Sequence, residues 1–451
     1  HEFFKYTKPH RKLLEQIELV IIDEISMVRA DNIDAIDRIL RVYSHNLREP
    51  FGGKQLLLVG DVFQLEPVVK NDEREILNRF YPTPYFFSAR VFGQIDLVSI
   101  ELQKVYRQTD PVFVGVLDHI RNNTAGAADL QLLNTRYGSQ IEESEADMYI
   151  TLATRRDTVD SINEKKLAEL PGDPITFEGV IEGDFPESSL PTSQELVLKP
   201  GAQIIFIKND FDRRWVNGTI GVIAGIDEEE ETIYVITDDG KECDVKRESW
   251  RNIRYRYNEK TKEIEEEVLG SFTQYPIRLA WAITVHKSQG LTFSRVVIDF
   301  TGGVFAGGQA YVALSRCTSL DGIQLKKPIN RADVFVRPEI VNFAGRFNDR
   351  QAIDKALKQA QADVQYAAAS RAFDKGDMEE CLEQFFRAIH SRYDIEKSVP
   401  RRFIRRKLGV INTLKEQNKK LKEQMREQQE RLRQYAHEYL LMGNECITQA
   451  H

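Results

Sequence analysis

Two short apolar segments, each followed at once by polar residues, constrain the fold of this chain most strongly. Residues 19–22 lead into Asp23 and Glu24, and residues 55–59 lead into a glycine turn that contains Gln64. Apolar runs of this length predict strands that are buried on both faces of a parallel sheet. Sheets of this kind bind their ligands beyond the carboxyl ends of the strands. The polar residues are therefore expected to lie at one site.

These residue types suit a metal-bound nucleotide. Asp23 can hold Mg²⁺ directly or through water, and Glu24 can polarise an attacking water. Gln64 can hydrogen-bond a γ-phosphate or its attacking water. Each residue also has a simpler interpretation. Asp23 and Glu24 can be a solvated pair after a buried strand, and Gln64 can be a capped loop glutamine. The occurrence of both strands in one chain favours the nucleotide site.

Composition limits what else the chain can be. Its 451 residues suffice for about three domains. The net charge is −8, so a nucleic-acid site must be a local basic channel on an acidic body. The four cysteines show no paired metal spacing, which argues against a structural zinc site and fits a reducing cytosol. No apolar run approaches the roughly 20 residues of a membrane span, so no membrane partner is expected.

Three further segments carry polar residues that a packed core does not explain. Residues 101–108 contain Arg107, and a predicted helix over residues 309–317 contains Arg316. An arginine fork can spread its charge over several phosphate oxygens, although a surface salt bridge is the simpler reading of either residue alone. Between them, an apolar strand from residue 277 ends in a dense polar cluster, whose members are Thr284, His286, Lys287, Ser288, Gln289 and Gly290.

Together and in this order, these segments resemble the motifs of the PIF (petite integration frequency) family of DNA helicases, which belongs with the RecD-like enzymes to superfamily one, subfamily B. The resemblance covers roughly residues 15–325. It implies an α/β fold with two RecA-like parallel-sheet motor domains, an inserted SH3-like β-barrel and an all-α C-terminal extension. It also implies ATP-dependent 5′-to-3′ movement on single-stranded DNA, a role in genome maintenance (repair, recombination and telomere maintenance), and a bacterial cytoplasmic location at the nucleoid.

The resemblance also implies a role for each site residue. ATP and Mg²⁺ are the expected cofactors, with Asp23 as the metal ligand. The residues expected to act on the nucleotide are Asp23, Glu24, Gln64, Arg107 and Arg316, with Gln289 and Gly290 linking the nucleotide to the DNA contact. The residues expected along the DNA strand are Thr284, His286, Lys287 and Ser288. Expected partners are single-stranded DNA and DNA forks or G-rich structured DNA.

The same resemblance divides the chain into domains. The expected divisions are a first motor domain at 1–108, a second at 109–208 and 273–325, a barrel at 209–272 and a helical extension at 326–451. Within the barrel segment, Arg213, Arg214 and Trp215 form a basic-aromatic cluster. This cluster either contacts single-stranded DNA or packs its tryptophan on the barrel, and the sequence leaves both open.

The helical extension shows two patterns. Residues 366–389 are similar to one tetratricopeptide unit. Farther on, a heptad seam has polar interruptions at two positions; its members are Ile411, Leu414, Asn418, Leu421, Met425, Gln428, Leu432, Tyr435 and Tyr439. A coiled-coil partner and a long repeat-capping helix are equally compatible with this seam, and either gives the region a possible protein partner.

One expected motif is missing. The phosphate-cradling sequence G-x-x-x-x-G-K-[ST] is absent, since Gly52-Gly53-Lys54 is followed by Gln55 and opens a strand. We therefore expect that the chain is truncated at its N-terminus and that this polypeptide binds ATP poorly. Because tetratricopeptide repeats are not stable alone and the chain stops at His451 in mid-pattern, we also expect truncation at the C-terminus. The alternative is a nucleotide-free DNA-binding or partner-recruiting module derived from a helicase. The gene sequence upstream of His1 distinguishes the two hypotheses.

Overall fold

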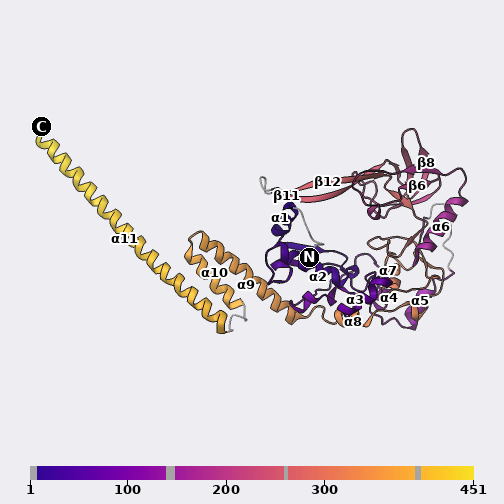
Figure 1. The fold of residues 1–451 in the computed structure, drawn as a ribbon, viewed down its shortest axis with the longest axis horizontal. Coiled ribbons are helices and arrows are strands. Elements are labelled where there is room, and N and C mark those ends of the chain that lie inside the picture. The colour runs from indigo at the N-terminus through magenta and orange to yellow at the C-terminus, as the bar shows by residue number, and fades with distance from the viewer. Residues whose placement is uncertain (1–7, 139–147, 259–262, 392–397, 451) are drawn as a thin grey trace. The chain divides into compact units, whose positions relative to one another are not determined.

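The structure is a computed structural model that describes residues 8–138, 148–258, 263–391 and 398–450 (Figure 1). It divides into two compact units. Unit 1 contains residues 1–97 and 102–346, and unit 2 contains residues 98–101 and 347–451. Among the described residues, no helix is both long and apolar enough to cross a membrane.

The first lobe of unit 1 is built on two parallel strands, β1 (Leu19–Ile22) and β2 (Gln55–Leu58). Its helices are α1 (Lys8–Gln16), α2 (Ala30–Tyr43) and α3 (Asn71–Phe80), with 3₁₀ turns at Ile25–Met27, Pro50–Gly53, Phe86–Ser88 and Arg90–Gly93. The amphipathic α2 buries Ile33 and Leu40, as its apolar spacing predicts.

The expectation that both strands are buried on two faces is wrong for this pair. Their residues alternate between exposed and half-buried, and Ile21 is 59% exposed. The physical reason is that only two strands form this sheet within the described residues, and the face that carries Leu19, Ile21 and Leu57 has no cover there.

The second lobe has a four-stranded parallel sheet in the order β14-β3-β15-β16. The strands are β3 (Ile150–Ala153), β14 (Ala282–Thr284), β15 (Val296–Asp299) and β16 (Ile323–Leu325). Every residue of β3 and β15 is buried, which is the pattern expected for a parallel sheet between helices. The predicted α/β class with parallel sheets is confirmed.

Four helices accompany this sheet: α4 (Pro111–Arg121), α5 (Ala127–Asn134), α6 (Arg156–Glu169) and α7 (Gln309–Ser315). The core of the lobe contains Phe113, Ile150 and Phe300, and it also takes in Leu65 from the segment that follows β2. Leu65, the residue after Gln64, therefore connects the first lobe to the core of the second.

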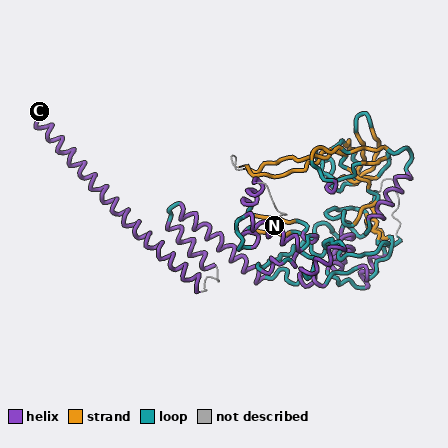
Figure 2. The backbone as a smooth tube through the Cα atoms, in the orientation of Figure 1, coloured by secondary structure: helices purple, strands orange, loops and turns teal. Residues whose placement is uncertain are grey.

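An antiparallel β region is inserted into the second lobe (Figure 2). Its five-stranded sheet has the order β10-β9-β8-β7-β13. The strands of the region are β4 (Ile175–Glu178), β5 (Val180–Gly183), β6 (Glu195–Leu198), β7 (Gln203–Phe206), β8 (Ile220–Asp227), β9 (Thr232–Thr237), β10 (Glu242–Val245), β11 (Glu248–Asn258), β12 (Glu263–Gln274) and β13 (Ile277–Leu279), with a 3₁₀ turn at Glu187–Ser189. Its likeness to an SH3 barrel stays a prediction.

The insertion is larger than the expected range of 209–272. β7 was assigned to the motor, but it pairs antiparallel with β8 and β13 of the insertion. The apolar run from residue 277 is also two strands, because β13 joins the insertion and β14 joins the motor sheet. An apolar run shows that a strand is buried but does not show which sheet it joins.

A connecting segment follows β16 and ends unit 1. It contains a 3₁₀ turn at Arg331–Asp333 and α8 (Pro338–Ala344). Asn134 of α5 exchanges two hydrogen bonds with the Ile329 backbone, and the Phe343 ring stacks on Phe87 of the first lobe at 4.5 Å. Residues 326–346, expected in the helical extension, therefore pack on the motor lobes.

Unit 2 is helical, as expected. α9 (Arg350–Asp374) and α10 (Met378–Ser391) pack together, and the rings of Tyr366 and Phe385 meet edge to face at 5.4 Å. α11 (Ser398–Ala450) is a single helix of 53 residues. The tetratricopeptide likeness stays a prediction.

Candidate nucleotide and DNA site

The ends of β1 and β2 meet in a tight backbone contact. Glu24 adopts a left-handed conformation (φ 49°), and its N–H bonds the Asp23 carboxylate at 2.9 Å. The next N–H, that of Ile25, donates to Val59 O at 3.0 Å. A side chain at Gly60 (φ 148°) would lie 2.9 Å from Ile25 N, so a glycine is required for the two strand ends to come this close. Non-glycine residues with positive φ gather at functional sites.

Three polar side chains from separate segments then converge. Gln289, from the loop after β14, donates through Nε2 to Glu24 Oε2 at 2.8 Å and to Gln64 Oε1 at 3.2 Å. The other amide atom, Gln289 Oε1, is buried and has no hydrogen-bond partner among the described residues. A buried acceptor without a partner is costly, so this atom marks a position where a ligand or water with a donor fits.

The segment that contains Arg107 is fixed against the end of α7. Arg107 Nη1 donates to Ser315 O at 3.3 Å, while Gln108 Nε2 donates to Ser315 O at 3.0 Å and to Cys317 O at 2.9 Å. Gln108 is buried, but Arg107 is only half-buried. Arg107 therefore remains accessible beside the predicted site.

Arg316 lies close by but is almost completely buried, with 1% of its surface exposed. Its guanidinium donates to Val312 O at 3.1 Å, to Leu291 O at 3.2 Å and to Ser315 Oγ at 3.2 Å. Burial and the nearby Arg107 lower the pKa of Arg316 to about 10, against the opposing effect of Glu24. The structure thus brings Arg316 within electrostatic range of Glu24, but backbone carbonyls hold its donors.

Asp61 is a site residue that the sequence analysis did not single out. Its carboxylate accepts from Phe63 N at 3.1 Å and from Arg121 of α4 at 3.4 Å. A hydrogen bond to Asp61 also contributes, after burial, to a raised pKa of Tyr311 on α7. Asp61 therefore joins the turn after β2 to two helices of the second lobe. The sequence signal that could have identified Asp61 is its position in the glycine turn, three residues before Gln64.

A second glycine sets the approach of α7 to the first lobe. Gly308 (φ 77°) precedes the helix, and a Cβ there would lie 2.3 Å from the carbonyl oxygens of both Phe63 and Gln64. Only a residue without a side chain allows this contact.

The predicted DNA-contacting residues differ in exposure. Lys287 is exposed, and the pKa of its amine is lowered by partial burial and by Arg278 and Arg156. Burial also lowers the pKa of His286. Thr284 is half-buried, and its Oγ1 accepts from Lys287 N at 3.2 Å. The sequence analysis missed the contribution of Arg156 because it lies far from Lys287 in the sequence. It missed Arg278 because this residue stands within an apolar strand segment.

Ser288 and Gly290 complete the loop. Ser288 is fully buried, and its hydroxyl donates to Val285 O at 2.7 Å, so this side chain has no surface to offer a DNA strand in this structure. We keep the DNA-contact prediction for Thr284, His286 and Lys287, and assign Ser288 to shaping the loop. Gly290 is exposed with φ 79°.

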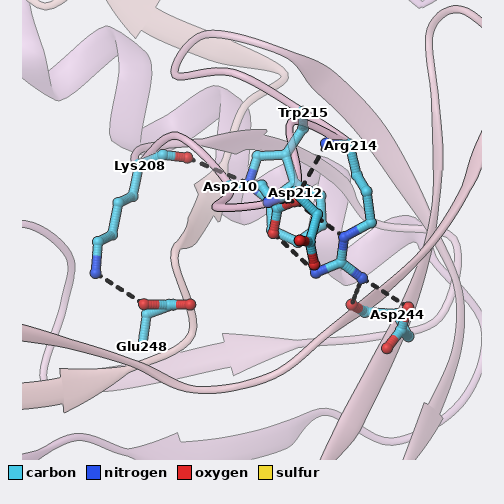
Figure 3. Close-up of polar contacts among 7 residues, drawn as sticks. All are labelled: Lys208, Asp210, Asp212, Arg214, Trp215, Asp244 and Glu248. Carbon is cyan, nitrogen blue, oxygen red and sulfur yellow. Dashed lines mark hydrogen bonds and ion pairs between the residues drawn. The ribbon is translucent and has the colours of Figure 1, made fainter.

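Two residues of the basic-aromatic cluster, Arg214 and Trp215, make polar contacts within the insertion (Figure 3). Trp215 is buried, stacks on Phe206 at 4.4 Å and donates to Lys208 O at 3.2 Å. Arg214 bonds Asp210 and Asp244, each at 2.8 Å. The structure therefore shows the tryptophan packed within the insertion, and contact of the cluster with DNA stays a prediction. Phe211, at the outer end of the same loop, is 97% exposed.

Comparison with known proteins agrees with this geometry. A family model described as PIF1-like helicase matches residues 3–120. The ATP-dependent DNA helicase Pif1 of Campylobacter jejuni is 33% identical over 329 residues, which is 70% of this chain and 70% of that protein. The chain belongs to the PIF1-like helicase family. It is therefore an enzyme of the ATP-dependent DNA helicase class.

Solved Pif1 structures share this Pif1-like fold. A Bacteroides Pif1 in complex with ADP-AlF4 is 39% identical, with a TM-score of 0.69 over 76% of this chain and 79% of that chain. A Bacteroides Pif1 bound to single-stranded DNA is also 39% identical, with a TM-score of 0.58 over 78% of this chain and 80% of that chain.

The residues of this Pif1-like helicase also suit a magnesium nucleotide. No group of three or more His, Cys, Asp or Glu side chains able to hold a metal occurs within the described residues. Mg²⁺ does not need such a group, because with nucleotides it takes one or two carboxylates and fills its other positions with phosphate oxygens and water. Asp23, an exposed carboxylate beside Glu24, fits that role.

Proposed function

We propose that this Pif1-like helicase couples ATP hydrolysis to 5′-to-3′ movement along single-stranded DNA, with Mg²⁺ as the metal. The observation that carries the proposal is the bridge from Gln289 to Glu24 and Gln64. It joins the loop with the predicted DNA contacts to the two residues best suited to act on the attacking water. DNA and nucleotide are therefore connected through one short segment.

At the nucleotide, each side chain has a task that matches its chemistry. Glu24 orients and polarises the attacking water, and Gln64 with Gln289 holds that water against the γ-phosphate. Asp23 would hold Mg²⁺, which neutralises phosphate charge. Arg107 is accessible and meets the γ-phosphate first. Arg316 exchanges its carbonyl partners for phosphate oxygens as the lobes close, since a charged acceptor makes stronger hydrogen bonds than a carbonyl.

At the DNA, a group of cations on this acidic protein provides the local basic path. Arg278 and Arg156 lie near enough to lower the pKa of Lys287, whereas Asp160, which pairs with Arg156 at 3.5 Å, opposes them. Bound phosphates would relieve the repulsion among the three cations. The loop of residues 209–217 leads into Gly218, where a Cβ would lie 2.9 Å from the side chain of Leu291, four residues after Lys287. We propose that Phe211 on this loop stacks on a base.

The coupling follows from the shortness of the connection. Lys287 and Gln289 lie two residues apart, so a shift of the loop on the DNA moves Gln289 relative to Glu24. Hydrolysis then opens the cleft, and alternate gripping by the two lobes gives a step. We propose forks and G-rich structured DNA as substrates, genome maintenance as the role and the bacterial nucleoid as the location.

Unwinding assays test this proposal with the protein expressed from its complete gene. A duplex with a 5′ single-stranded tail should be unwound in the presence of ATP and Mg²⁺, and a duplex with only a 3′ tail should not. Preference for the 3′ tail would contradict the direction. Absence of unwinding on both substrates, despite measured DNA binding, would contradict the helicase assignment.

A further inference from the structure

The long helix α11 carries an apolar stripe that the other described helices of unit 2 leave exposed. Its residues recur at spacings of three and four, the pattern that keeps side chains on one side of a helix. They are largely exposed: Leu421 is 57% exposed, Met425 60%, Leu432 66% and Tyr435 57%. The stripe spans residues 411–446, which is about 54 Å of helix and about five heptads.

Two polar residues within the stripe restrict what can cover it. Asn418 occupies an a position and Gln428 a d position of the heptad. In a parallel pair of identical helices in register, each amide meets its own copy and can form a hydrogen bond. In the antiparallel register that places Asn418 opposite Tyr435, Gln428 faces Met425, so both amides lose polar partners. The antiparallel register that pairs Asn418 with Gln428 is shifted by one heptad and reduces the overlap of the two stripes to residues 411–435. A polar a-position residue is a known determinant of register and strand number.

The residues at the e and g positions, which flank the stripe, are compatible with a parallel, in-register pair. In a parallel pair, a g residue faces the e residue five positions later in the other helix. Gln417 then faces Lys422, Gln424 faces Gln429, and Arg431 faces Ala436. None of these pairs joins like charges, although the helix is rich in lysine, arginine and glutamate. The flanks therefore do not oppose the association of two copies.

We propose that α11 pairs with α11 of a second copy in a parallel, in-register two-stranded coiled coil over residues 411–446, so that the protein is a dimer. The pairing buries the exposed stripe and joins two motor units through one helix each. Cys446 falls at an a position, 35 residues after Ile411, and is exposed in this single chain. The proposal places the two copies of Cys446 opposite each other.

Sedimentation equilibrium of the 451-residue chain, without DNA and in reducing buffer, tests the dimer. The wild-type protein should have twice the chain mass at micromolar concentration. The double variant Leu421→Glu/Leu432→Glu should be a monomer. The matched control Asn412→Glu/Gln434→Glu adds the same charge on the outer side of the helix and should remain a dimer. A monomeric wild-type protein, or a seam variant that stays dimeric, overturns the proposal.

Cysteine cross-linking tests the orientation without any seam substitution. Oxidation by copper(II)-phenanthroline with air joins two thiols as a disulfide, and oxygen accepts the two electrons and two protons. The wild-type chain should give a covalent dimer on a non-reducing gel. Cys446→Ser should give none, because Cys243, Cys317 and Cys381 are buried. A wild-type dimer in sedimentation that fails to cross-link through Cys446 overturns the parallel in-register arrangement.

Discussion

At the scale of single residues, Gln289 has the most specific role. One amide joins the loop with the predicted DNA contacts to Glu24 and Gln64, and it leaves a buried acceptor that we propose the substrate water occupies. Gln289→Ala removes both functions without touching the predicted phosphate-binding cations. We expect kcat for DNA-stimulated ATP hydrolysis to fall by about 100-fold, as when one preorganised polar group is removed from an active site.

The measurement is steady-state ATP hydrolysis with saturating single-stranded DNA, together with DNA affinity by fluorescence anisotropy. Affinity should change little. Gln131→Ala, at an exposed position on α5, is the matched control and should leave both quantities as in the wild-type protein. A Gln289→Ala protein with normal kcat would disprove the bridging role.

His286 gives a prediction about pH. Burial lowers its folded-state pKa below the ordinary value of 6.5, so the unfolded chain takes up the proton first as the pH falls. The unfolded state then binds more protons, and stability decreases with acidification through that window. Between about pH 7.5 and about pH 5.5, wild-type protein should lose more thermal stability than His286→Gln.

Thermal melting at a series of pH values measures this difference. The exposed His437 on α11 provides the control, since His437→Gln should follow the wild-type curve. Parallel pH profiles of the wild-type protein and His286→Gln would show that burial of the imidazole does not act on stability.

The sequence identified candidate site residues better than it predicted their burial and their contact partners. Asp23, Glu24 and Gln64 could be found because each follows a strand at a fixed offset. The burial of Ser288 and Arg316 could not be found, since a polar residue after a strand can point to solvent or back into the lobe. Asp61 and Arg156 were missed because their importance depends on partners that are distant in the chain.

At the scale of elements, the contact between α7 and the turn after β2 sets the distance between the lobes. Gly308→Ala would place a methyl group against the carbonyl oxygens of Phe63 and Gln64. We expect a loss of about 1–3 kcal/mol in stability from this overpacking, and a loss of DNA-stimulated hydrolysis because the two halves of the site separate.

Gly303→Ala is the matched control for this substitution. Gly303 also has a positive φ (78°), but a Cβ there would meet nothing within 4 Å, so it tests the backbone strain alone. Denaturant unfolding and ATP hydrolysis should show a clearly larger defect for Gly308→Ala. Equal effects of the two variants would mean that the close approach of α7 has no special role.

The elements themselves were predictable where a local pattern decides them. The motor strands and α2 follow from apolar runs and helical spacing, and the hairpin of β9 and β10 follows from its Asp-Asp-Gly turn. The assignment of β7 and β13 to the insertion was not predictable, because strand pairing is a property of the folded chain. The same holds for residues 326–346, whose packing depends on Phe343 meeting Phe87.

At the scale of the whole molecule, an acidic protein is proposed to bind a polyanion through a small basic path. Affinity for single-stranded DNA should therefore fall with salt, and each phosphate contact should add about 0.7 to the slope of log affinity against log salt concentration. Lys287→Ala should weaken binding and reduce the slope by about 0.7. Lys420→Ala, on the exposed surface of α11, should change neither.

Anisotropy titrations at several salt concentrations give both quantities. An unchanged slope for Lys287→Ala would remove this residue from the DNA path. A reduced slope with the control unaffected would locate a phosphate contact on the second lobe.

The central claim is that side chains from both lobes act on one ATP and that DNA controls this action. The most direct measurement is ATP hydrolysis by the protein from its complete gene, with and without single-stranded DNA, for the wild-type protein and Glu24→Gln. The account predicts strong stimulation of the wild-type protein by DNA, and loss of hydrolysis in Glu24→Gln with DNA binding retained. Equal wild-type rates with and without DNA, or normal turnover by Glu24→Gln, would contradict it.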